Sequence, residues 1–156
     1  MNKVIILCVG NYLMGDEGVG VHFAKLLETE NLPAHFQVID GDSGGFKLME
    51  YLEEEAGIIL VDATLDDKPA GTIRLITPKF AADFPKAMST HEIGLKDLVE
   101  SLSLLGRLPK VNLFIVSIDT IQPLSVSLSK EVEACLPKLK EQVLTLAYSL
   151  IEQPAA

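Results

Sequence analysis

Residues 4–20 read VIILCVGNYLMGDEGVG, a continuous apolar run that leads into a glycine-rich turn. Two of the glycines, Gly10 and Gly15, have the spacing of a phosphate-binding P-loop. That loop would continue with Lys and Ser or Thr, whereas this chain continues with Asp16 and Glu17. Two carboxylates repel a phosphate more strongly than the positive end of a helix attracts it. The stretch therefore predicts a strand, a turn and a helix, with a turn that suits a cation.

The composition is that of a globular protein with one domain, residues 1–156. Apolar residues make up 48% of the chain, which excludes an intrinsically disordered protein. The net charge of −9 argues against nucleic acid or an anionic membrane as a partner. The apolar runs are too short to span a bilayer and the first residues do not resemble a signal peptide, so a cytoplasmic location is expected.

Short apolar runs alternate with segments of helical periodicity, the pattern of a three-layer α/β/α sandwich with a mainly parallel sheet. The link between the third and fourth strands is too short for a crossover helix, so the fourth strand is expected to be antiparallel. Five strands are predicted, at Val4–Val9, Phe36–Ile39, Ile58–Val61, Ile73–Ile76 and Val111–Ile118.

Four helices are predicted between and after these strands. The first follows the glycine-rich turn with Asp16 as its N-cap, and the last starts near Ser129, with a kink or a restart at Pro137. The second is expected to begin at residues 44–45 and the third to cover about residues 95–102.

Polar residues that follow the strands are the candidates for a site, because open α/β sheets bind ligands at the carboxyl ends of their strands. Glu17 follows the first strand, Asp40 the second and Asp62 the third. His91 lies in the loop before the third predicted helix. One imidazole and two carboxylates suit Ni²⁺, Zn²⁺ or Co²⁺ better than Mg²⁺ or Ca²⁺. Glu17, Asp62 and His91 are therefore a candidate transition-metal site.

Each of these three residues also has a structural explanation. Asp62 could accept hydrogen bonds from turn amides, and His91 could begin a helix. Glu17 could stabilise the first turn of the helix, an effect of about 0.3–1 kcal/mol. Their long spacing matches no local metal motif, so the residues alone leave both interpretations open.

The chain offers no evident catalytic nucleophile of its own. Ser43 lies in a glycine-rich turn that lacks the Gly-x-Ser-x-Gly spacing of serine hydrolases. Cys8 and Cys135 are expected to be buried thiols rather than partners in a disulfide framework.

At these positions the sequence resembles the hydrogenase maturation endopeptidases, which trim the large subunit of nickel-iron hydrogenases. The resemblance extends over nearly the whole chain and rests on five motifs. They are Val9-Gly10-Asn11 with Gly15-Asp16-Glu17-Gly18-Val19-Gly20, then Asp40-Gly41, Val61-Asp62-Ala63, Pro69-Ala70-Gly71-Thr72 and His91-Glu92-Ile93-Gly94-Leu95.

The resemblance implies an α/β/α sandwich with a five-stranded sheet that contains one antiparallel strand. It also implies that Glu17, Asp62 and His91 contact the metal, and that Asp40 and Asp16 take part in cleavage. In this family the enzyme is thought to recognise nickel that the large-subunit precursor already carries, with zinc or cadmium as substitutes in vitro. It then removes a C-terminal extension from the precursor, and we expect it to act as a monomer. The resemblance leaves metallo-type and aspartic-type proteolysis both open.

Three other functions are compatible with the residues alone. The first is a nucleotide-binding or regulatory domain, although the turn lacks both Gly-x-Gly-x-x-Gly and a basic residue. The second is a metal carrier that uses the same three residues, which tight nickel binding by the isolated protein would favour. The third is an ordinary metallopeptidase or nucleoside-cleaving enzyme, which activity on generic peptides or nucleosides would reveal.

Overall fold

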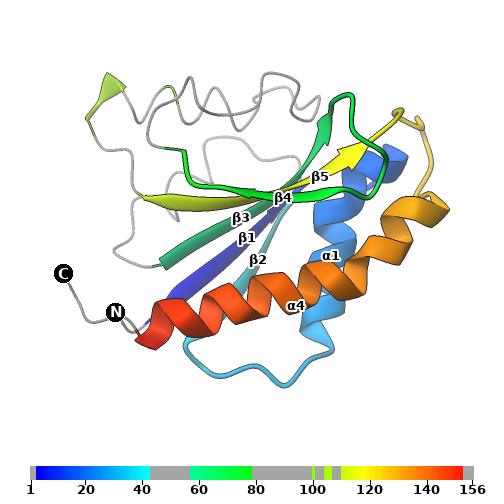
Figure 1. Cartoon of the computed structure of the whole chain (residues 1–156). Coiled ribbons are helices and arrows are strands. Elements are labelled where there is room, and N and C mark those ends of the chain that lie inside the picture. Colours follow the sequence, from blue (N-terminus) through cyan, green and yellow to red (C-terminus); the bar gives the residue numbers. More distant parts are fainter. Residues whose placement is uncertain (1–2, 43–56, 79–99, 101–103, 107–109, 153–156) are drawn as a thin grey trace.

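In the part of the chain that the structure describes, five strands form one sheet in the order β2-β1-β3-β5-β4 (Figure 1). The computed structural model describes residues 3–42, 57–78, 100, 104–106 and 110–152. The strands are β1 (Val4–Val9), β2 (Phe36–Asp42), β3 (Gly57–Leu65), β4 (Ile73–Ile76) and β5 (Val111–Ile118).

The sheet is parallel except at one edge. Neighbours among β1, β2, β3 and β5 run parallel, whereas β4 pairs antiparallel with β5, as predicted. After β1 the chain returns to β2 on one side of β1, and β3 then lies on the other side. The order of strands therefore reverses between β1 and β3, and such a switch point is where doubly wound sheets bind ligands.

The central strands are buried on both faces. Val4 and Ile6 of β1 belong to the core under the helices, while Ile5 and Leu7 on the opposite face are also fully buried. A strand that is apolar on both sides suits the middle layer of a sandwich. The predicted α/β/α class, with its single antiparallel strand, is confirmed.

Helices α1 (Val19–Glu28) and α4 (Lys130–Glu152) contact each other and cover the same face of the sheet (Figure 1). A single 3₁₀ turn, η1 (Gly15–Gly18), precedes α1. Gly18 holds the N-cap position of α1 without a side-chain hydrogen bond, so the prediction of Asp16 as N-cap was wrong. The reason is that the Asp16 carboxylate accepts its hydrogen bonds from Ser129 and Gln122, between β5 and α4, as described below.

Helix α4 continues through Pro137 without ending, so the predicted alternative of a helix that restarts at this residue was wrong. Leu139 and Val143, beyond the proline, are fully buried in the core. Tertiary packing of this apolar face outweighs the hydrogen bond that proline removes. The helices predicted near residues 44–45 and 95–102 fall almost entirely outside the described residues.

Asp66 anchors the antiparallel edge strand. Its carboxylate accepts hydrogen bonds from Arg74 Nη2 at 2.8 Å, from Ser117 Oγ at 3.1 Å and from the Lys68 backbone N–H at 3.0 Å. These bonds join the end of β3 to the following turn, to β4 and to β5. Burial raises the pKa of Asp66, but these donors outweigh it and hold the pKa below its usual range.

We expect Asp66→Asn to destabilise the fold in a pH-dependent way. Because the pKa of Asp66 is lower in the folded chain, its bonds stabilise the fold above the unfolded pKa, about 3.9. They are lost as the pH falls through the folded value. The free energy of unfolding should drop by about 1 kcal/mol at pH 7 and by much less at about pH 2. Urea unfolding at both pH values, with exposed Asp67→Asn as control, measures this, and equal losses would contradict it.

Candidate active site

Two completely buried carboxylates lie at the switch-point edge of the sheet. Glu17 lies in η1, the next element along the chain after β1, and Asp62 lies in β3. β1 pairs with β3 only as far as Val61, so Asp62 is the first β3 residue past the β1 pairing. Since η1 also packs against β3, the structure brings Glu17 and Asp62 to the same edge of the sheet, which is called the acidic edge below.

Asp62 was predicted to follow the third strand, but the strand continues through it. β3 extends to Leu65 because its residues beyond Val61 pair with β5. The Asp62 Oδ1 accepts the N–H of Ala63 at 2.8 Å. A carboxylate inside a buried strand is costly unless hydrogen bonds or a cation compensate for its desolvation. Asp62 is therefore a stronger candidate for function than a carboxylate in a solvated turn.

Asp16 is also buried, and its carboxylate bridges two distant parts of the chain. Its Oδ1 accepts the backbone N–H of Ser129 at 2.6 Å, just before α4 begins. Its Oδ2 lies 3.4 Å from the donating Nε2 of Gln122, and its own N–H donates to Gln122 Oε1 at 2.9 Å. Asp16 thus ties η1 to the loop between β5 and α4. Its predicted role in catalysis stays a prediction.

Asp40 lies inside β2 and is exposed to solvent. It pairs with Cys8 of β1, and Cys8 also pairs with Val61 of β3. Paired residues of parallel strands share a face, and Cys8 and Val61 belong to the core under α1 and α4. Asp62, one residue after Val61, faces the other side. The structure thus places Asp40 and Asp62 on opposite faces of the sheet.

His91 lies outside the described residues. Within the described ranges, no group of three or more His, Cys, Asp or Glu side chains is arranged to hold a metal ion. Of the three predicted metal contacts, the structure therefore describes two, Glu17 and Asp62.

Both cysteines are free and buried, as predicted. Burial raises the pKa of the Cys8 thiol, and the charges of Asp40 and Glu28 add to this effect. Burial, together with the charge of Asp16, raises the pKa of Cys135 to about 11. Since the thiolate is the nucleophilic form, neither cysteine is suited to attack a peptide bond at neutral pH.

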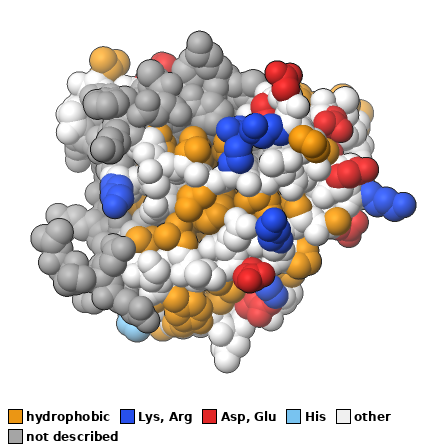
Figure 2. All heavy atoms as spheres, viewed as in Figure 1, with side chains coloured by type: hydrophobic (Ala, Val, Ile, Leu, Met, Phe, Trp, Pro, Cys, Tyr) orange, Lys and Arg blue, Asp and Glu red, His pale blue; other side chains and the backbone are white. Residues whose placement is uncertain are grey.

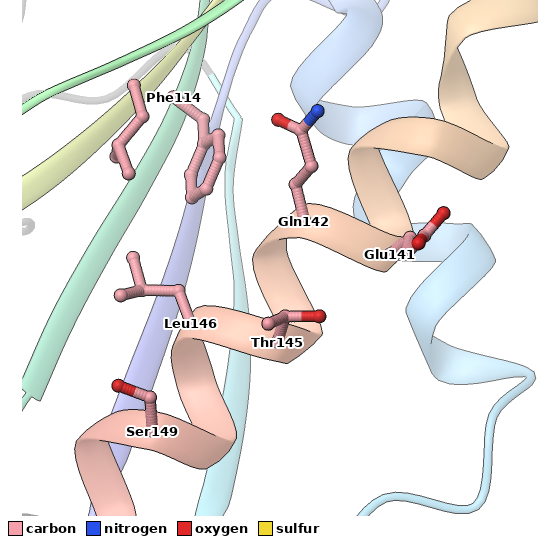
Figure 3. Close-up of a pocket in the computed structure, with 7 residues that line it drawn as sticks. Phe114, Glu141, Gln142, Thr145, Leu146 and Ser149 are labelled. Carbon is pink, nitrogen blue, oxygen red and sulfur yellow. The ribbon is translucent and has the colours of Figure 1, made fainter.

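An apolar groove of about 470 Å³ lies between α4 and the β4–β5 edge, where Figure 2 shows hydrophobic side chains at the surface. Phe114 and Leu146 line it, with the α4 side chains of Gln142, Thr145 and Ser149 along its rim (Figure 3). Gln142 lies 13 residues beyond Ser129, roughly 20 Å along the helix from the Asp16 contact. The groove is therefore separate from the acidic edge.

Gln122 and Ser129, which hold Asp16, were missed by the sequence predictions. Both follow β5 at the carboxyl edge of the sheet, so the search along strand ends could have reached their loop. A neutral amide and a backbone N–H gave no chemical reason to select them.

The fold and this edge define a doubly wound α/β protein with a buried acidic site at its switch point. The chain belongs to the hydrogenase maturation protease family, whose model matches residues 21–146. It is accordingly a peptidase. Among the described residues, no helix has the length and apolarity needed to cross a membrane.

Individual relatives agree with the family. The chain is 32% identical to the hydrogenase 2 maturation protease of Escherichia coli K12 over 146 residues, which cover 91% of this chain and 88% of that protein. The structure of the hydrogenase maturating endopeptidase HybD from E. coli is similar with a TM-score of 0.82 and 29% identity, covering 94% and 93% of the two chains. A hydrogenase 2 maturation peptidase from a Thaumarchaeota archaeon gives a TM-score of 0.72 at 27% identity, covering 96% and 99%.

Proposed function

We propose that this protein is the endopeptidase that removes the C-terminal extension of a nickel-loaded hydrogenase large-subunit precursor. The observation that carries the proposal is the pair of completely buried carboxylates, Glu17 and Asp62, at the switch point of a maturation protease fold. Two buried carboxylates attract a cation strongly, because burial removes their hydration. In this proposal the cation is the nickel of the substrate.

Glu17, Asp62 and His91 would contact the nickel that the precursor carries. The donor set fits, because carboxylate oxygens and an imidazole nitrogen together suit a divalent transition metal. Glu17 and Asp62 come from separate elements at one edge of the sheet, which supports their convergence. His91 completes the set as a prediction from the sequence. Zinc or cadmium could replace nickel in vitro on the same grounds.

Cleavage also needs a group that accepts a proton from the attacking water. Among the predicted carboxylates, Asp40 is exposed to solvent, whereas Asp16 is buried and hydrogen-bonded to Ser129 and Gln122. Asp40 is therefore the better candidate for a group that meets water, and it would have to reach the scissile bond from the end of β2, because it lies on the opposite face of the sheet from Asp62. The metal could also polarise the scissile carbonyl, so these residues are compatible with both an aspartic-type and a metal-assisted reaction.

The test is to mix the protein with candidate large-subunit precursors, prepared with and without nickel, and to measure product masses. We expect one cut, near the C-terminus, only in a nickel-loaded precursor. Equally fast cleavage of the nickel-free precursor, or of unrelated peptides, would contradict the proposal. Equilibrium dialysis adds a second measurement, since tight nickel binding by the isolated protein would favour a metal carrier.

We further propose that the reaction takes place in the cytoplasm and that the working enzyme is a monomer. Glu17 and Asp62 lie at one edge of the sheet in the same chain, so this pair does not need a second copy of the protein. Sedimentation of the protein alone and with its precursor would test whether the working enzyme is a monomer. Processing activity found only in the dimer fraction would contradict it.

A further inference from the structure

We propose that Gln122, in the loop between β5 and α4, is a positioning residue that fixes Glu17 for the reaction. The inference rests on the proposed function, because it assigns Glu17 to contact with the precursor. Gln122 acts through Asp16, the residue next to Glu17 in η1.

The turn that carries Glu17 has no side-chain cap of its own. Instead, the oxygen and the nitrogen of the Gln122 side-chain amide both form hydrogen bonds with Asp16 in this turn. Its Oε1 accepts the N–H of Asp16 at 2.9 Å, and its Nε2 lies 3.4 Å from Asp16 Oδ2. The same Nε2 donates to Thr120 Oγ1 at 3.1 Å, which sets the orientation of the amide.

The contact between Gln122 and the turn is too close for any side chain at Gly15. Gly15 has φ 59°, in the left-handed region that favours glycine. A Cβ on Gly15 would meet Gln122 Oε1 at 2.2 Å and Gln122 Cβ at 2.7 Å. The turn and the glutamine therefore fit against each other with no free space between them.

Backbone bonds hold the two loops together on the other side of Gly15. The N–H of Gly15 donates to the Ser125 carbonyl at 2.7 Å, and the N–H of Ser125 donates to the Leu13 carbonyl at 3.0 Å. These bonds fix residues 13–15 but do not reach Asp16 or Glu17. Gln122 and the N–H of Ser129, which donates to Asp16 Oδ1 at 2.6 Å, extend the attachment to Asp16, whose Cα is about 3.8 Å from that of Glu17.

A small displacement of Glu17 is expected to have a large effect on rate. Contact groups must be held within about 0.5 Å of their productive position, and a misplacement of about 1 Å can cost a factor of 100. Removing the Gln122 bonds would leave the Glu17 carboxylate present but less well placed. This predicts a loss in kcat rather than in precursor binding.

The experiment uses Gln122→Met, which has a similar length but no amide, and Gln142→Met as the matched control on α4. Processing of the nickel-loaded precursor gives kcat and KM, and amide hydrogen exchange of the free protein follows η1. For Gln122→Met we expect kcat to fall between about tenfold and a hundredfold with KM unchanged. Exchange in residues 15–18 should become at least several-fold faster, with the rest of the chain unaffected. The control should match the wild type in both measurements.

Wild-type kcat and wild-type exchange in Gln122→Met would overturn the inference, as would faster exchange throughout the chain. If Gln122→Met does not fold, Thr120→Val decides, since it removes only the bond that orients the amide. That variant should lower kcat by a smaller factor, with KM unchanged, and an unchanged kcat would then overturn the inference. If the wild type cleaves no precursor, the proposed function fails, while the exchange data still show whether Gln122 fixes the turn.

Discussion

Glu17→Gln is expected to lower kcat/KM for the nickel-loaded precursor by at least about a hundredfold while the protein stays folded. Partners that merely orient a metal ligand already contribute about 10–100-fold, so loss of an anionic ligand should cost at least as much. Glutamine has nearly the same shape as glutamate, so the packing of η1 against β3 should survive. Processing assays by mass spectrometry, with circular dichroism and thermal unfolding of each variant, measure both effects.

The matched control for Glu17→Gln is Glu133→Gln, the same chemical change at an exposed position on α4. It should process the precursor at the wild-type rate. Asp62→Asn should behave like Glu17→Gln, because both carboxylates occupy the same edge. Wild-type processing by Glu17→Gln would remove the basis for a metal contact at this edge, and a folded but inactive Glu133→Gln would point to a general electrostatic effect.

The arrangement of the sheet was predictable because it depends on signals that lie close together in the sequence. The bounds of β1, β4 and β5 coincide with their apolar runs, and the short link before Ile73 was enough to give β4 its antiparallel direction. β2 and β3 are longer than predicted because they continue through polar residues. Asp62 and Thr64 stay in β3 through pairing with β5, and hydropathy carries no sign of such pairing.

The site was only partly predictable, for the same reason. The search along strand ends located Glu17 and Asp62, because it depends only on where apolar runs end. The face on which a residue lies depends on register, so the separation of Asp40 from Asp62 could not be derived from spacing. The bond between Asp16 and Ser129 joins residues 113 positions apart, and no local pattern indicates it.

Gly20→Ala is expected to destabilise the fold by about 3 kcal/mol, although alanine is the better helix former by about 1 kcal/mol. Gly20 lies in the first turn of α1, and a Cβ there would be 2.1 Å from the Val9 carbonyl oxygen and 2.9 Å from its carbon. That oxygen belongs to the end of β1 and cannot rotate away as a flexible side chain would. Alanine would therefore push α1 away from the sheet at the point where the acidic edge is built.

The control for Gly20→Ala is Gly57→Ala at the start of β3, where the Cβ would meet the Leu150 side chain at 3.3 and 3.4 Å. These contacts require Leu150 to move by only a few tenths of an ångström, and alanine suits a strand better than glycine, so the change should stay within about 1 kcal/mol. Urea unfolding of both variants gives the two free energies. At Gly20, helix propensity predicts that alanine raises the free energy of unfolding, whereas steric contact predicts that it lowers it. A Gly20→Ala variant more stable than the wild type would therefore show that α1 is not packed this tightly on β1.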